Sequence, residues 1–144
     1  MTYSPNPDDF PLRATDKIRY ADTDRQGHVN NAIFATLLET GRVELLYDPA
    51  WPLADAGSAF VIARLALDFR SEIVWPGEVV IGTRIAALGR SSIRLEQAIF
   101  QNGACAATAE TVIVLMDETT RKSRPLPAAA RERLTALFPE AGDV

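Results

Sequence analysis

The segment NNAIFATLLETGRVELL, residues 30–46, decides the fold of this 144-residue chain. Its hydrophobic positions cover most of the circumference of a helix, and only three charged side chains interrupt them. Asparagine is among the residues preferred at a helix N-cap, so Asn30 or Asn31 is expected to cap this helix. A helix that is hydrophobic on nearly every side has to be enclosed by the rest of the protein. We therefore predict one long central helix.

Downstream of residue 60 the hydrophobic period changes from that of a helix to that of a strand. Hydrophobic and polar residues alternate, which is typical of half-buried strands, and turn signals separate them at residues 75–77, 89–91 and 102–103. The hydrophobic phase slips at Ala98 and Phe100, which indicates a β-bulge or burial on both faces. The expected strands are residues 17–21, 60–69, 79–85, 93–100 and 105–116, and a second helix is expected at residues 126–138.

The order of these elements predicts an α+β fold. A sheet hides so hydrophobic a helix only if it curves around it, so we expect a curved antiparallel sheet of about five strands wrapped around the helix. Such a sheet has a free edge, with which a second copy of the chain can pair. Residues 1–144 are expected to form a single domain, with a loose, proline-interrupted leader at residues 1–16.

The composition is that of a soluble globular protein, with 47% hydrophobic and 24% charged residues. Nineteen acidic against 15 basic side chains give a formal charge of −4, which argues against nucleic acid or an anionic membrane as partner. The single cysteine, Cys105, excludes an intramolecular disulfide, and one His with one Cys argues against a metal site. The chain shows neither a signal peptide nor a membrane-spanning run, so we expect a cytoplasmic protein.

The segment YADTDRQGHVNN, residues 20–31, carries the chemistry and immediately precedes the helix. A helix N-terminus offers unpaired backbone N–H groups and a positive dipole end, both suited to a carbonyl oxygen that becomes an oxyanion. A carboxylate just upstream, such as Asp24, can act as a nucleophile or a general base. The residues alone leave a second interpretation open, in which Asp24 and Asn30 only cap and tighten the loop.

This segment resembles the hotdog-fold acyl-CoA thioesterases of the 4-hydroxybenzoyl-CoA thioesterase type. Their motif reads roughly Asp-x-Asp-x-x-Gly-x-Val, followed by a helix carrying Glu-x-x-Arg. The matching residues in this chain are Asp22, Asp24, Gly27, Val29, Glu39 and Arg42. The resemblance covers about residues 15–118 and implies a hotdog fold that hydrolyses an acyl-CoA thioester to a free acid and coenzyme A.

The resemblance also implies roles for residues before and at the start of the helix. Asp24 would attack the thioester carbonyl or activate water against it, whereas Asp22 would shape the loop. The backbone N–H of Asn31 would donate to the oxyanion. His28, the third candidate catalytic residue, departs from the relatives, which often have a hydrophobic residue at this position. A single histidine beside the site would bind the thioester, orient Asp24 or only hold the loop.

The phosphates of coenzyme A need cations or amide donors. The residues expected to bind them, at an accessible hairpin tip, are Arg90, Ser91 and Ser92. A second basic cluster at residues 121–124 is the alternative, and both groups are also explained as solvated surface. No separate cofactor is expected, because coenzyme A is part of the substrate. The resemblance and the free sheet edge imply a homodimer, or a tetramer of such dimers, with the active site at the dimer interface.

Two features of the central helix have structural interpretations. Glu39 and Arg42 are three residues apart, so they are expected to form an intrahelical ion pair or to act at an interface. Gly41 lowers helix stability by roughly 1 kcal/mol relative to alanine. Close packing against the sheet is therefore expected at Gly41.

Two other functions stay open from the sequence. A non-catalytic acyl-CoA-binding module would need the pocket but not the carboxylate of Asp24. An enoyl-CoA hydratase or acyl dehydratase of the same fold pairs an Asp with a His after four intervening residues, and here three residues separate Asp24 from His28. The fold by itself does not choose among these chemistries.

Overall fold

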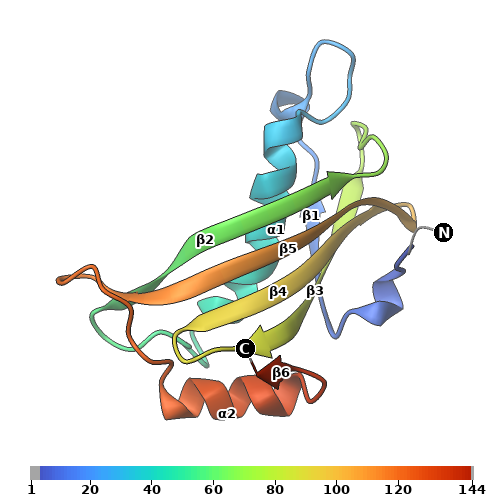
Figure 1. Cartoon of the computed structure of the whole chain (residues 1–144). Coiled ribbons are helices and arrows are strands. Elements are labelled where there is room, and N and C mark those ends of the chain that lie inside the picture. Colours follow the sequence, from blue (N-terminus) through green and yellow to red (C-terminus); the bar gives the residue numbers. More distant parts are fainter. Residues whose placement is uncertain (1–3, 144) are drawn as a thin grey trace.

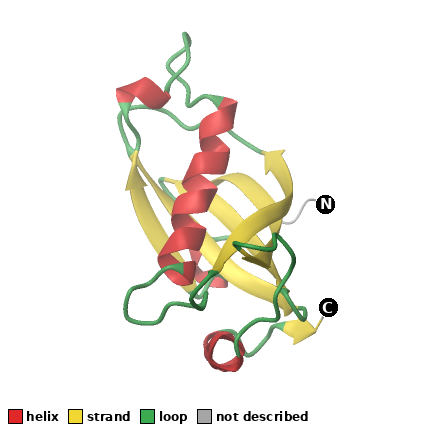
Figure 2. Ribbon diagram, turned by 90° about the vertical axis from the view of Figure 1, so that its left-hand side faces the viewer, coloured by secondary structure: helices red, strands yellow, loops and turns green. Residues whose placement is uncertain are grey.

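The structure, a computed structural model, describes residues 4–143. One sheet curves around helix α1, and a second helix, α2, lies at one end of the sheet (Figures 1 and 2). The strand order is β1-β3-β4-β5-β2 with antiparallel neighbours, and the short β6 pairs in parallel with β3. The elements are β1 (Leu12–Lys17), α1 (Asn31–Leu46), β2 (Ser58–Phe69), β3 (Glu78–Leu88), β4 (Ser92–Gln101), β5 (Ala104–Asp117), α2 (Ala128–Leu137) and β6 (Gly142–Asp143), with short 3₁₀ helices η1 (Pro7–Asp9) and η2 (Tyr20–Asp22). The α+β prediction is confirmed.

Helix α1 begins after Asn30, whose side-chain oxygen accepts a hydrogen bond from Ala32 N at 3.0 Å. The face toward the sheet is buried, but Glu39 and Val43 are exposed, Val43 to 38%. The prediction that the helix is enclosed on nearly every side was therefore wrong for the single chain. The sheet covers one side of α1 and leaves the other side open.

Gly41 packs closely against the sheet, as predicted. A Cβ atom at Gly41 would lie 2.7 Å from Cγ2 of Ile81 and 3.0 Å from Nε2 of Gln97. The expected ion pair between Glu39 and Arg42 is absent among residues 4–143. Burial lowers the pKa of Arg42, and the charge of Glu39 offsets part of that effect.

The N-terminal segment differs from the prediction. The first strand is β1 at Leu12–Lys17 rather than residues 17–21, and residues 20–22 form η2. The leader predicted at residues 1–16 contains η1 and most of β1, and residues 1–3 lie outside the described part. Phe10 is 3% exposed and meets the ring of Phe100 edge-on at 6.0 Å. It lies so close to Gly82 that a Cβ there would be 2.6 Å from the Phe10 ring.

Phe10 also explains the phase slip predicted in the strand at residues 93–100. Ala98 and Phe100 pack with Phe10 on one face of the sheet, while Ile99 packs in the core on the α1 side. Both faces of β4 are thus buried there. The register between β4 and β5 also shifts at Ile99 and Phe100, so a β-irregularity is present as well.

Hydrophobic residues gather at the two ends of α1. One cluster surrounds the start of the helix and includes Val29, Phe34 and Ile73. The other surrounds its end and includes Leu46 and Leu134, the latter from α2. Within residues 4–143, no helix is long and hydrophobic enough to cross a membrane.

Candidate functional site

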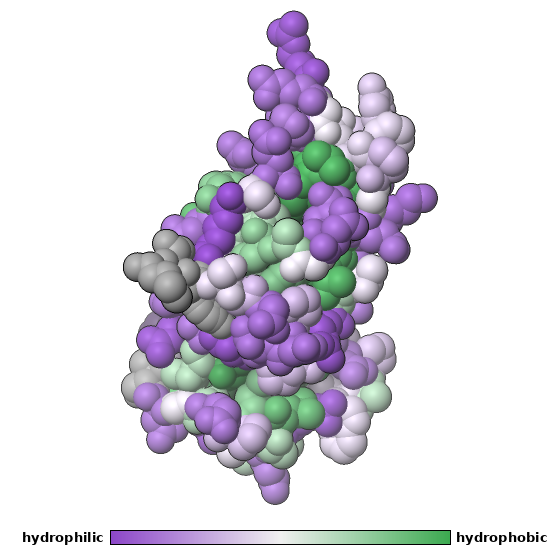
Figure 3. All heavy atoms as spheres, turned by 90° about the vertical axis from the view of Figure 1, so that its right-hand side faces the viewer, coloured by the Kyte–Doolittle hydropathy of each residue, from purple (hydrophilic) through white to green (hydrophobic). Residues whose placement is uncertain are grey.

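The loop between η2 and α1 projects beyond the sheet at the N-terminal end of the helix (Figure 1). Hydrophilic residues cover this projecting part of the molecule (Figure 3). Asp22 lies at its base, 4% exposed, where its carboxylate accepts a hydrogen bond from Arg19 N at 2.8 Å. The carbonyl of Asp22 accepts another from Asn30 N at 2.8 Å. Asp22 thus connects both ends of the loop.

Asp24 lies at the turn of this loop and is exposed. Its Oδ1 atom accepts hydrogen bonds from Gln26 N at 2.8 Å and His28 N at 3.2 Å. Gly27 has a φ of 81°, which favours glycine and closes the turn. Among residues 4–143, Oδ2 of Asp24 has no hydrogen-bond partner, so one oxygen holds the loop and the other faces no protein donor.

The first backbone amides of α1 are occupied except at Asn31. Ala32 N donates to the Asn30 side chain, and Ile33 N donates to the Asn30 carbonyl at 2.9 Å. Within the described chain, the N–H of Asn31 has no acceptor. Asn31 is an exposed residue, so its N–H at the positive end of the helix dipole is available to a carbonyl oxygen or an anion.

A cleft of about 450 Å³ brings the three predicted catalytic residues together. Asp24, His28 and Asn31 come from the loop and the start of α1, and the opposite wall comes from the end of β2 and the residues after it. The ring of Phe34 meets Phe69 edge-on at 5.0 Å at this wall. The lining residues are Asp24, Gln26, His28, Val29, Asn31, Phe34, Phe69, Arg70, Ser71 and Glu72.

His28 forms a contact that the sequence did not predict. Its Nε2 lies 3.0 Å from Oε2 of Glu72. The two residues meet because the backbone of His28 bridges to Val74 and Val29 N donates to Ile73 O at 2.8 Å. No periodicity in the sequence indicates this pairing, because it depends on how the two segments meet in the folded chain.

Arg90, Ser91 and Ser92 are not brought to this cleft. They form the hairpin between β3 and β4, at the end of the sheet beside α2 (Figure 1). Arg90 donates to the Ser91 hydroxyl at 3.2 Å, and the Arg90 carbonyl accepts from Leu126 N at 2.8 Å. The hairpin and the Asp24 loop therefore lie at opposite ends of α1 in one chain.

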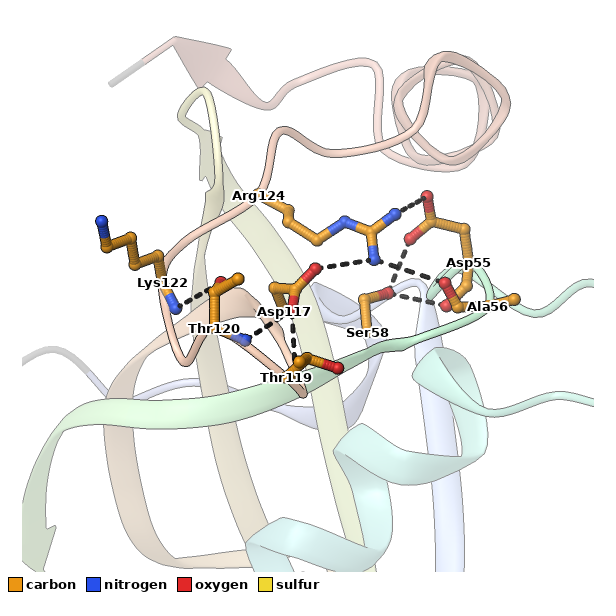
Figure 4. Close-up of polar contacts among 8 residues, drawn as sticks. All are labelled: Asp55, Ala56, Ser58, Asp117, Thr119, Thr120, Lys122 and Arg124. Atoms are coloured by element: carbon orange, nitrogen blue, oxygen red, sulfur yellow. Dashed lines mark hydrogen bonds and ion pairs between the residues drawn. The ribbon is translucent and has the colours of Figure 1, made fainter.

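The alternative basic cluster at residues 121–124 is partly committed to ion pairs (Figure 4). Arg124 reaches Asp55 at 3.0 Å, Asp117 at 3.5 Å and the Ala56 carbonyl at 3.3 Å. It thereby connects the segment after β5 to the loop before β2. Arg124 has a structural explanation that does not involve a ligand.

Asp117 organises the turn that follows β5. Its Oδ1 accepts hydrogen bonds from Thr120 N at 2.8 Å and Thr119 N at 2.9 Å (Figure 4). The backbone donors Thr120 and Thr119, followed by the charge of Arg124, lower the pKa of Asp117 below its usual value. The ionised carboxylate is therefore the form that stabilises this turn.

Metal ligands do not gather in the part of the chain that the structure describes. No group of three His, Cys, Asp or Glu side chains there is arranged to hold an ion. Cys105 is half-buried, and burial is the main reason that its pKa is raised. This favours the neutral thiol, and a half-buried neutral thiol acts as a small packing residue.

Comparison with known proteins shows which family this architecture belongs to. Residues 18–134 match the thioesterase-like superfamily. A thioesterase from Thermus thermophilus, solved in complex with coenzyme A and Zn, is 35% identical, with 89% of this chain and 94% of that chain covered and a TM-score of 0.75. A predicted thioesterase from Bacillus stearothermophilus is 27% identical, with coverages of 88% and 96% and a TM-score of 0.79. The PA5185 protein from Pseudomonas aeruginosa strain PAO1 shares the fold, at 23% identity, coverages of 96% and 99% and a TM-score of 0.86. Comparison with the curated proteins found no match.

Proposed function

The chain belongs to the thioesterase-like superfamily and is a thioester hydrolase, and we propose that it cleaves acyl-CoA thioesters to a free carboxylic acid and coenzyme A. The Asp22-x-Asp24-x-x-Gly27 motif supports a place among hotdog thioesterases of the 4-hydroxybenzoyl-CoA type. Coenzyme A in the Thermus thermophilus relative supports the choice of carrier. The reaction as proposed needs no separate cofactor.

One observation carries the proposal: Asp24 and Asn31 line the same cleft, and within residues 4–143 one carboxylate oxygen of Asp24 and the N–H of Asn31 have no hydrogen-bond partner. The Asn31 N–H would donate to the thioester carbonyl oxygen and hold the negative charge that develops on it. Asp24 would then attack the carbonyl carbon, or take a proton from water that attacks it. Cleavage of the C–S bond expels coenzyme A as a thiolate, which takes a proton from Asp24 or from water. If Asp24 is the nucleophile, water then hydrolyses the acyl–Asp24 anhydride to the carboxylic acid.

The bonds of Asp24 fit such a role. Oδ1 is fixed by Gln26 N and His28 N, so the carboxylate is held in one orientation. Oδ2 is left for the reaction.

A homodimer is part of the proposal. Strand β2 lies at the edge of the sheet, and Ile62, Leu65 and Phe69 along it are exposed to 51%, 37% and 52%. An unpaired edge with large exposed hydrophobic side chains is suited to pairing with a second copy. The Phe69 end of this edge borders the cleft, so a partner would cover the place where an acyl group enters.

The experiment that tests the proposal is an assay of free thiol release from a panel of acyl-CoA and aryl-CoA esters. We expect hydrolysis of at least one ester with a kcat/KM in the usual enzymatic range of about 10⁴–10⁸ M⁻¹s⁻¹. Binding of the esters without thiol release would favour the acyl-CoA-binding module instead. Addition of water to an enoyl-CoA without thiol release would favour the hydratase.

A further inference from the structure

We propose that Glu72 is a positioning residue for His28: its carboxylate holds the imidazole by Nε2 and leaves Nδ1 to accept a hydrogen bond from the attacking water. The inference rests on the proposed function, because it assigns His28 to the same hydrolytic cleft. It adds a residue outside the Asp-x-Asp-x-x-Gly motif. It also gives a function to the contact between His28 and Glu72, which are more than 40 residues apart in the sequence.

The contact itself is direct. His28 Nε2 and Glu72 Oε2 are 3.0 Å apart, and the side chains are 30% and 66% exposed. Within residues 4–143, the His28 ring has no other charged partner. In the neutral ring a lone pair on Nε2 would face the carboxylate oxygen and be repelled, so the N–H lies on Nε2 and Nδ1 is left as an acceptor.

The backbone around the pair is already fixed. His28 N donates to Asp24 Oδ1, and Asp24 N donates to His28 O at 2.8 Å. On the other side, the bridge to Val74 and the Val29 N–H on Ile73 O hold the two segments together. The backbone bonds do not fix the side-chain torsions of His28, and the contact with Glu72 restrains these torsions.

The place of the pair separates it from an ordinary surface ion pair. An exposed ion pair contributes little to stability and affects no reaction. His28 and Glu72 both line the cleft that holds Asp24 and the free N–H of Asn31. A ring held in one orientation there orders water beside the thioester, and loss of order at a reacting centre lowers kcat.

A double-mutant cycle tests the proposal. We expect Glu72→Ala to lower kcat about tenfold, with KM changed less than about twofold, because the residue orients and does not bind substrate. In a His28→Ala background the same change should cost nothing further. Glu72→Gln keeps an acceptor oxygen and should retain kcat within about threefold. Glu78→Ala, which removes an exposed carboxylate that does not line the cleft, is the matched control and should match the wild type.

The ring of His28 supplies a readout that does not depend on activity. His28 is the only histidine, so its ring signals in NMR spectra are unambiguous. Glu72→Ala should lower the order parameter of the ring, and Glu78→Ala should not. Unchanged ring order, an unchanged kcat, or an equal loss in both backgrounds would overturn the role of Glu72. A wild-type protein that releases no thiol would instead overturn the proposed function, while ring order would still test the contact.

Discussion

Two substitutions at Asn31 distinguish a role of its backbone N–H from a role of its side chain. Asn31→Pro deletes this N–H, and Asn31→Ala keeps it. Asn31 is the first residue of α1, where proline is favoured because the N–H has no partner within the helix. Asn30 has φ −61° and ψ 140°, which is the conformation that a residue before proline adopts. The fold should therefore accept both changes.

The expected magnitude follows from the bonds that remain. Ala32 N and Ile33 N stay paired with Asn30 in both variants, so stability should change by less than about 0.5 kcal/mol. Removal of one oxyanion donor lowers kcat by about 10²–10³, or about 3–4 kcal/mol of transition-state stabilisation. Asn31→Ala should retain most of the wild-type kcat.

The assay is steady-state thiol release from the best acyl-CoA ester, after circular dichroism and sedimentation have shown that fold and assembly are unchanged. The comparison between the two variants decides the matter. Equal losses in both would assign the effect to the carboxamide of Asn31. A wild-type kcat in Asn31→Pro would remove the residue from the reaction.

Three further predictions concern stability and assembly. Gly41→Ala places a methyl group 2.7 Å from Cγ2 of Ile81. The cost of overpacking should outweigh the gain in helix propensity and lower Tm by about 3 °C in a thermal melt. A higher Tm would contradict the close packing. Because the pKa of Asp117 is lowered in the folded state, its stabilisation exists above the ordinary Asp value of about 3.9 and is lost as pH falls through the lowered pKa. The Tm of the wild type should thus exceed that of Asp117→Asn at pH 7, with the gap shrinking below about pH 4; a gap independent of pH would refute the assignment. Ile62→Arg on the open edge of β2 should leave a folded monomer where the wild type sediments as a dimer at micromolar concentration. A fully active wild-type monomer would contradict the dimer.

The sequence predicted the long strands and both helices well because each has a strong local signal. Residues 30–46 cover a helix with hydrophobic positions, and the alternation after residue 60 continues through hairpins with recognisable turns. The start of the sheet was mispredicted because Pro7 and Pro11 made residues 1–16 look irregular. In fact Pro11 only precedes β1, and Phe10 folds back onto Gly82, a contact that depends on the assembled sheet.

The part of the candidate site that is local in sequence was also predictable, whereas its long-range contact was not. Asp24, His28 and Asn31 lie within eight residues of sequence, so a loop before a helix brings them together without long-range information. Glu72 was missed because its approach to His28 depends on the pairing of residues 28–29 with 73–74. The hairpin at Arg90 was assigned to the phosphates of coenzyme A because it places a cation at an accessible tip. In one chain it lies away from the cleft, and its role in binding stays a prediction.

The most direct test of the central claim is the turnover of Asp24→Asn. The amide keeps an oxygen that can accept the N–H groups of Gln26 and His28, so the loop should keep its shape, while the carboxylate that attacks or activates water is lost. We predict that kcat for thiol release falls by about 10²–10⁴ and that the binding of a CoA ester stays within about twofold of the wild type. Wild-type turnover in Asp24→Asn would contradict the account.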